Sequence, residues 1–200
     1  IGVTDTVGYQ IHTNLEALPE ALRERLAGKR LVLAVGRLVP YKGFSVLIEA
    51  TSQLEADAVV VIVGTGPLKE DLQRRIDAAN LADKVMLIGR QSDDALRVLF
   101  QRAALFCLPS VERSEAFGVV LVEAMSHGLP IVATQIPGSG VAWVNAHQVS
   151  GLNVPANDTT ALTAACNEVL ASDVLSADLT RDSRTRFENE FTKKDSTKHM

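Results

Sequence analysis

Short apolar runs alternate with longer helical patterns along most of this chain, and that alternation is the feature that most limits its fold. The run at residues 58–63 (AVVVIV) is rich in β-branched residues and too short for a helix, which indicates a strand buried on both faces. Comparable runs lie at residues 31–35, 84–88, 104–108, 130–134 and 151–154. Strands that alternate with helices in this way form βαβ units. We therefore expect an α/β protein with a Rossmann-like parallel sheet of about six strands and helices on both faces.

The segments between these runs carry helix signals. Ser92 is suited to cap a helix, and the acidic Asp93 suits its first turn. Pro67 suits the first turn of the preceding helix. The helices are expected at residues 19–26, 44–54, 67–79, 93–102, 117–127 and 159–172, followed by a helical tail. Residues 137–140 are expected to form a loop.

Composition excludes several classes of protein. Hydrophobic residues make up 46% and charged residues 22% of the 200 residues, an ordinary globular balance. The 20 Lys and Arg against 24 Asp and Glu give a net charge of -4, with no basic excess for a nucleic acid. The apolar runs are far shorter than the roughly 20 residues that cross a bilayer. Cys107 and Cys166 have no disulfide or metal-ligand spacing, so we expect a cytoplasmic protein that does not bind nucleic acid.

Two basic residues follow the first expected strand. In open parallel sheets, ligands bind just outside the carboxyl ends of the strands. Gly36 allows a tight turn there, and Arg37 and Lys42 flank the start of the next helix. Two cations beside a helix N-terminus suit a diphosphate. The alternative is a surface loop with two solvated cations.

The second expected strand is followed by Gly64-Thr65-Gly66-Pro67. Glycines at this place let the backbone approach a ligand closely, although they also simply end a strand. The spacing is not the GxGxxG fingerprint of dinucleotide-binding folds, so NAD binding is disfavoured.

The strongest feature is an acidic pair, Glu115 and Glu123, around the start of an apolar helix. A carboxylate in such a helix must find partners or shift its pKa. With a helix start near Phe117, Glu115 precedes the helix and Glu123 lies about two turns into it, so both can line one cleft. The free amides of Gly118 and Val119 would face the same space and suit an anion. The alternative is an acid that merely favours the helix N-terminus, with Glu123 exposed at the rim.

Metal and nucleophile motifs are missing from the sequence. The four histidines are scattered without ligand spacing, and no Asp-x-Asp marks a metal held against phosphates. No GxSxG marks a nucleophile. We therefore expect no metal site and no nucleophilic triad.

Taken in order, these segments resemble the retaining glycosyltransferases of the GT-B fold, family 4 (group 1), and in particular bacterial polysaccharide and O-antigen enzymes. The resemblance covers residues 32–157 and a tail pattern at residues 186–191. It is carried by Gly36-Arg37…Lys42-Gly43, Gly64-Thr-Gly66-Pro67, Pro109-Ser110, Glu115-x7-Glu123, Gly128-Leu-Pro130-Ile-Val-Ala-Thr and Gly151-Leu-Asn-Val-Pro155. The acidic pair in its Phe-Gly-Val…Glu-Ala-Met context is highly specific, whereas the glycine turns alone are not.

The resemblance implies a role for each position. Arg37 and Lys42 would neutralise the donor diphosphate in the reaction, and Glu115 would contact the donor sugar. Donor-binding roles would fall to Gly36, Gly66, Arg90, Gln91, Phe117, Gly118, Val119 and Glu123. Within that set, Glu123 would hold the ribose hydroxyls, and the segment 89–91 would border the base. A hexosyl group of a GDP- or UDP-linked sugar would be transferred with retention through an oxocarbenium-like state, without a cofactor or metal.

The resemblance also implies that the chain is the donor-binding, C-terminal half of a longer enzyme. Residues 1–30 would form an interdomain linker and a leading helix, residues 31–192 the donor-binding domain, and residues 193–200 a frayed tail. The acceptor, a glycan or a lipid-linked sugar, would bind through the N-terminal domain, and any membrane contact would be peripheral. Two alternatives stay open: a nucleotide-binding module of this fold without transferase activity, and a relative of nucleotide-sugar epimerases.

Overall fold

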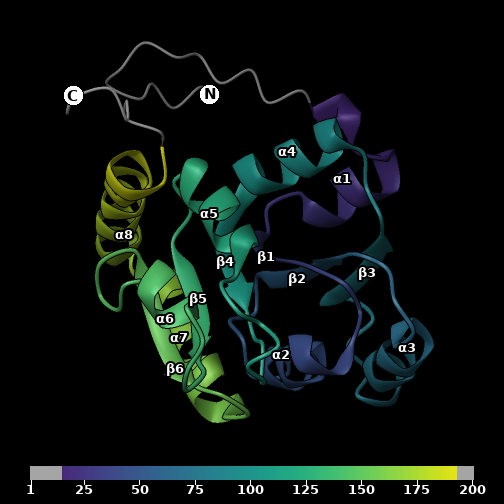
Figure 1. The fold of residues 1–200 in the computed structure, drawn as a ribbon. Coiled ribbons are helices and arrows are strands. Elements are labelled where there is room, and N and C mark those ends of the chain that lie inside the picture. The colour runs from purple at the N-terminus through teal and green to yellow at the C-terminus, as the bar shows by residue number, and fades with distance from the viewer. Residues whose placement is uncertain (1–14, 193–200) are drawn as a thin grey trace, which may run out of the picture.

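A parallel sheet of six strands forms the centre of the molecule (Figure 1). The computed structural model describes residues 15–192. Residues 1–14 of the expected linker and leading helix (residues 1–30) and the expected tail at residues 193–200 lie outside that range. The strands are β1 (Arg30–Val35), β2 (Ala58–Val63), β3 (Val85–Gly89), β4 (Ala103–Leu108), β5 (Ile131–Gln135) and β6 (Gly151–Pro155). They run in the order β3-β2-β1-β4-β5-β6, and each pair is parallel. The expected Rossmann-like sheet is therefore confirmed.

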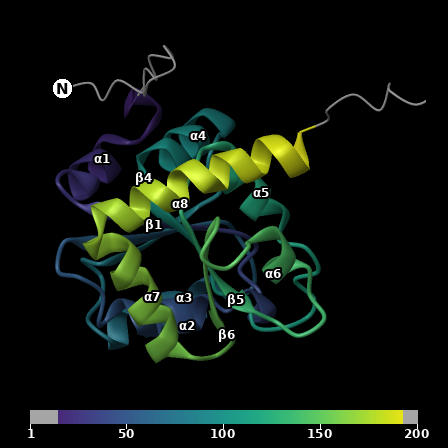
Figure 2. The same ribbon diagram turned by 90° about the vertical axis from the view of Figure 1, so that its left-hand side faces the viewer.

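Helices cover both faces of the sheet, as expected (Figure 1). The described α-helices are α1 (Glu20–Leu26), α2 (Phe44–Thr51), α3 (Lys69–Ala78), α4 (Asp93–Arg102), α5 (Val119–Ser126), α6 (Val141–Val144), α7 (Thr159–Ala171) and α8 (Asp173–Arg186). Buried side chains of α1, α4 and α5 pack on one face, and those of α2, α3 and α7 pack on the other. Helix α8 contacts both α5 and α7, and Figure 2 shows it crossing the molecule as one long ribbon.

Local sequence signals explain most helix boundaries. The Ser92 side chain accepts a hydrogen bond from the Ala95 amide and caps α4, as its position predicts. Helix α5, however, begins at Val119 rather than near Phe117, because Gly118 takes the left-handed conformation (φ 69°) and cannot continue a helix backwards. Helix α3 begins after Pro67, at Lys69. The short α6 follows the loop at residues 137–140 and had no expected counterpart.

The strands supply both hydrophobic cores, because successive side chains point to opposite faces. In β2, Val60 and Ile62 pack under α2, α3 and α7, whereas Val59 and Val61 pack under the helices on the other face. All six residues of β2 are buried, which confirms the strand expected to be covered on both sides.

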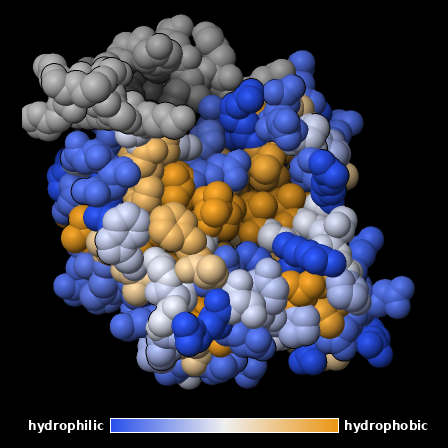
Figure 3. Space-filling model, viewed as in Figure 1, coloured by the Kyte–Doolittle hydropathy of each residue, from blue (hydrophilic) through white to orange (hydrophobic). Residues whose placement is uncertain are grey.

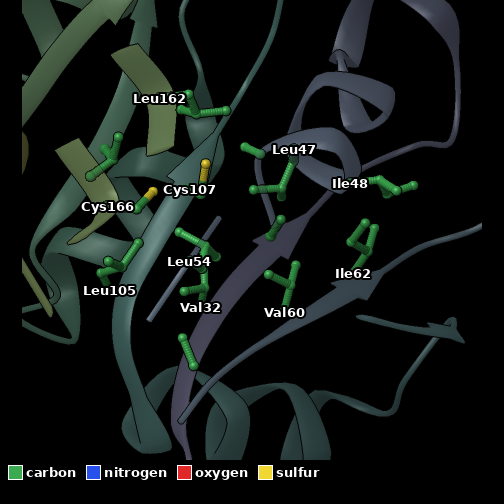
Figure 4. Close-up of a cluster of buried hydrophobic side chains, with 14 of the residues drawn as sticks. Val32, Leu47, Ile48, Leu54, Val60, Ile62, Leu105, Cys107, Leu162 and Cys166 are labelled. Carbon is green, nitrogen blue, oxygen red and sulfur yellow. The ribbon is translucent and has the colours of Figure 1, made fainter. Parts of the chain in front are cut away.

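Two cysteines lie in the core on the α2 and α7 side. Figure 4 shows Cys107 of β4 and Cys166 of α7 next to each other among apolar side chains. Both are free and buried. A hydrogen bond with Cys166, together with burial, raises the pKa of the Cys107 thiol well above its usual value. The pair is therefore a packing element of the reduced protein.

None of the helices described between residues 15 and 192 combines the length and the hydropathy of a membrane-spanning segment.

Candidate functional site

A cavity of about 580 Å3 lies at the carboxyl ends of the first three strands. Five of the residues expected to bind the donor meet in its wall: Gly36 and Arg37 after β1, Gly66 after β2, and Arg90 and Gln91 after β3. The remaining lining residues are Val35, Val63, Gly64, Thr65, Asp93 and Leu96. Arg37 and Arg90 are exposed, so their guanidinium groups are free to meet an anionic ligand in this cavity.

Backbone contacts between the loops after β1 and β2 shape this cavity. The two strands end in register, with Val35 opposite Val63. The Gly36 amide then donates to the Val63 carbonyl at 2.9 Å. A Cβ atom at Gly64 would lie 1.8 Å from the Gly36 carbonyl oxygen, and one at Gly66 would lie 2.4 Å from the Leu38 carbonyl oxygen. Glycine is therefore required at both positions for the loops to touch.

An ion pair lies beside the cavity, where the strand order reverses between β1 and β4. The Lys42 ammonium lies 2.5 Å from Oε2 of Glu115, and the Ser110 hydroxyl donates to the same oxygen at 2.8 Å. The side chains of Lys42 and Glu115 are only 12% and 9% exposed. The Lys42 stem passes Gly36, since a Cβ atom there would lie 3.3 Å from Cε of Lys42. The ion pair therefore connects to the cavity through Gly36.

The loops that carry this ion pair are held together by their backbones. The Val111 amide donates to the Tyr41 carbonyl at 2.8 Å. Gly43 follows Lys42 in the left-handed conformation (φ 66°), and a Cβ atom there would lie 2.0 Å from the Pro109 carbonyl oxygen. Only glycine permits this approach of the β1 loop to the β4 loop.

Glu115 is also anchored through its backbone. The Ser139 hydroxyl donates to the Glu115 carbonyl, and the Gly140 amide donates to the Ala116 carbonyl at 2.7 Å. The expected loop at residues 137–140 thus packs directly against the Glu115 segment. Glu115 is buried (7% exposed). The structure therefore does not favour the alternative in which this acid merely stabilises the helix N-terminus.

Aromatic side chains continue this segment on the surface. Phe117 lies 5.8 Å from Trp143 of α6 and 6.5 Å from Phe191, measured between ring centroids. The Arg186 guanidinium lies 5.5 Å from the Trp143 ring and donates to the Trp143 and Val144 carbonyls. Phe117 and Trp143 are nevertheless 39% and 55% exposed. The C-terminal end of the described chain therefore packs next to the Glu115 loop.

Glu123 does not lie in the buried environment that its apolar neighbours predict. It is exposed on α5, because the buried face of this short helix is formed by Leu121, Ala124 and Met125. Partial removal from water, followed by the negative charge of Asp93, raises the pKa of the Glu123 carboxyl. Since Asp93 lines the cavity, Glu123 lies close to it without lining it.

The expected anion-binding end of α5 lies outside the cavity wall. Phe117, Gly118 and Val119 do not line the cavity, and Val119 is 75% exposed. Figure 3, which shows the molecule from the same side as Figure 1, has apolar side chains gathered near the middle of the visible face, around α5. The structure thus brings the residues after β1, β2 and β3 into one cavity and places Glu115 and the start of α5 at its side.

Sequence reasoning gave no ligand role to four lining residues: Val35, Val63, Asp93 and Leu96. The sequence analysis explains Asp93 by the first turn of α4. It does not use the second property of this residue, its position just after β3. That position is the signal that could have found it, because every strand end in this sheet opens toward the ligand edge. Within the described residues, no cluster of three or more potential metal ligands occurs.

Comparison with known proteins places the chain in a family. Residues 20–189 match the family described as "Glycosyl transferases group 1", and the chain belongs to that family. It is 36% identical over 165 residues to O-antigen chain mannosyltransferase C of Escherichia coli, covering 82% of this chain and 43% of the relative. It is 34% identical over 173 residues to D-rhamnosyltransferase WbpZ of Pseudomonas aeruginosa, covering 86% of this chain and 44% of the relative. The chain therefore spans less than half the length of these relatives.

The fold is shared with solved structures of other proteins. A crystal structure of Anabaena HepE in complex with UDP is similar with a TM-score of 0.78 at 24% identity, covering 90% of this chain and 51% of HepE. The family resemblance and the fold inferred from the sequence are thus confirmed.

Proposed function

We propose that this chain is the donor-binding part of a retaining family 4 glycosyltransferase, which transfers a hexosyl group from a GDP- or UDP-linked sugar. The observation that carries the proposal is the cavity at the carboxyl ends of β1, β2 and β3, with Arg37 in its wall and Lys42 beside it. The family and the mannosyl- and rhamnosyltransferase relatives support it. The UDP named for the HepE complex supports a nucleotide ligand.

The proposed donor would lie across the cavity. Arg90 and Gln91 would border the base, and Glu123 would hold the ribose hydroxyls. Arg37 and Lys42 would bind the diphosphate with charge-assisted hydrogen bonds, together with the amides at the start of α5. Glu115 would then face the donor sugar.

In the proposed reaction, the bond between the sugar and the diphosphate breaks through an oxocarbenium-like state. Negative charge develops on the leaving diphosphate, and Arg37 and Lys42 would stabilise it where it forms. Neither a cofactor nor a metal is required. The acceptor, a glycan or a lipid-linked sugar, would bind to the part of the protein beyond this chain, in the cytoplasm and with at most a peripheral membrane contact.

Calorimetry and thermal unfolding with UDP, GDP and ADP test the proposal on this chain. One nucleotide is expected to raise the Tm, since a ligand present at 100 times its Kd stabilises by about 2.7 kcal/mol. Arg37→Ala and Glu123→Ala are expected to weaken that binding at least about tenfold. Arg74→Ala, which removes an exposed arginine of α3, is the matched control and should bind normally. No response to any of the three nucleotides would refute the site.

A further inference from the structure

One oxygen of Glu115 carries both of its polar side-chain contacts. The Lys42 ammonium and the Ser110 hydroxyl both donate to Oε2, at 2.5 Å and 2.8 Å. Among the described residues, none donates to Oε1 within hydrogen-bonding distance. Ser110 is fully buried and Glu115 is 7% exposed, so water replaces neither donor easily.

The proposed function places two demands on Lys42 in this site. Its ammonium pairs with the Glu115 carboxylate, yet the proposed donor needs the same charge at its diphosphate. Removing one partner from a buried ion pair leaves an uncompensated charge, which is strongly destabilising. A group that continues to donate a hydrogen bond to the carboxylate would lower the free-energy cost of losing the lysine.

We propose that Ser110 is a positioning residue that retains the Glu115 carboxylate when Lys42 exchanges it for the donor diphosphate. The inference rests on the proposed function, because the exchange requires a bound diphosphate. The Ser110 hydroxyl stays on Oε2 throughout, so the carboxylate keeps its orientation and Oε1 stays available to the donor sugar.

The surroundings of Ser110 suit this role. Ser110 follows β4, and its backbone carbonyl accepts a hydrogen bond from the buried Thr134 hydroxyl of β5. Ser139 holds the backbone of Glu115 by a separate contact. Neither anchor involves Lys42, so movement of the lysine leaves the Ser110 hydroxyl in place.

A double-mutant cycle for nucleotide binding tests the proposal. Calorimetry measures the affinity of this chain for GDP and UDP in the wild type, Ser110→Ala, Glu115→Gln and the double variant. Ser110→Ala is expected to weaken binding about tenfold, the loss of one hydrogen bond to a charged group. In the Glu115→Gln background, Ser110→Ala is expected to weaken nucleotide binding at most about twofold, because no carboxylate is left for Ser110 to hold.

Ser183→Ala is the matched control, since it removes an equally buried hydroxyl that bonds to the Leu129 carbonyl and not to Glu115. It is expected to change the affinity less than about twofold. Ser110→Thr keeps the hydroxyl and should restore binding. If Ser110→Ala does not fold, Ser110→Cys replaces it, with a weaker donor and an intermediate loss expected.

The two proposals fail in different ways. If the wild type binds neither GDP nor UDP, the proposed function fails. If the wild type binds but Ser110→Ala weakens binding equally with Glu and Gln at position 115, Ser110 acts only on the fold and the inference is overturned. An unchanged affinity in Ser110→Ala overturns it as well.

Discussion

The Lys42 ammonium contacts Oε2 of Glu115 at 2.5 Å and thereby joins the loop after β1 to the loop after β4. These two strands are neighbours, yet their loops lead to opposite sides of the strand order. Crevices for ligands form at such a reversal in open α/β sheets. The Glu115 carboxylate is thus the counter-ion of the lysine that the proposed diphosphate would recruit.

Loss of the lysine is expected to destabilise the fold. Lys42→Ala leaves the Glu115 carboxylate buried without a counter-charge, so the free energy of unfolding should fall by about 2–4 kcal/mol. Urea unfolding at pH 7 measures this free energy. Lys42→Ala combined with Glu115→Gln should recover most of the loss, because the unpaired charge is gone. A single variant as stable as the wild type would show that the pair contributes nothing to folding.

Gly43→Ala is expected to destabilise the fold more than an alanine at a glycine with open space around it. The added Cβ atom would lie 2.0 Å from the Pro109 carbonyl oxygen, and its φ of 66° strains any other residue. Gly28→Ala is the matched control, since Gly28 has the same φ region with open space around it. The control should cost about 1–2 kcal/mol and Gly43→Ala clearly more, measured as the loss in the free energy of unfolding. Equal losses would mean that the β1 and β4 loops separate freely.

Ionisation of Glu123 is expected to lower stability as the pH rises. Its folded pKa is raised by partial removal from water and then by Asp93, so the folded state prefers the protonated form. This stability is fully present below the unfolded pKa and is lost as the pH rises through the folded pKa. Glu123→Gln should therefore match the wild type below about pH 4 and exceed it in Tm by about 1–2 °C at pH 7.

Asp93→Asn provides the control for this pH effect. This substitution removes the charge that repels the Glu123 carboxylate. With Asn at position 93, the difference in Tm between chains with Glu and with Gln at position 123 should therefore be smaller. A Glu123→Gln variant less stable than the wild type at pH 7 would contradict the assignment. Greater stability combined with weaker nucleotide binding would mark Glu123 as a residue kept for binding rather than for folding.

The two cysteines are expected to resist thiol reagents in the folded protein. Cys107 and Cys166 are buried, and the raised pKa of Cys107 keeps its thiol protonated at neutral pH. With dithiobis-nitrobenzoate, the native chain should react slowly or not at all, whereas both thiols should react in denaturant. Rapid labelling of the native chain would mean that the core between β4 and α7 opens readily.

The sheet could be predicted closely because its signals are local. Each strand begins and ends within one residue of the expected bounds, since runs of β-branched and apolar residues stop at Gly or Pro. The family resemblance implied the roles of Arg90 and Gln91. The cavity residues Gly36, Arg37 and Gly66 could be predicted for a reason related to that of the strands. They follow strands, and the ends of parallel strands meet at one edge.

Tertiary contacts explain what the sequence could not predict. The exposure of Glu123 depends on which face of α5 meets the sheet, and an almost wholly apolar helix does not mark that face. The contact of Ser110 with Glu115 needs a fold-back over five residues that no periodicity encodes. The start of α5 depends on the left-handed conformation of Gly118, which glycine permits but does not dictate.

Trp143 gives the protein a built-in fluorophore at the edge of the candidate site. It is the one tryptophan of the whole sequence, and its ring lies 5.8 Å from that of Phe117, two residues after Glu115. Its indole is 55% exposed, so its emission senses changes in the solvent around it. Movement of the Glu115 segment would thus alter the emission of an unlabelled sample, and stopped-flow mixing could follow the arrival of a ligand in real time.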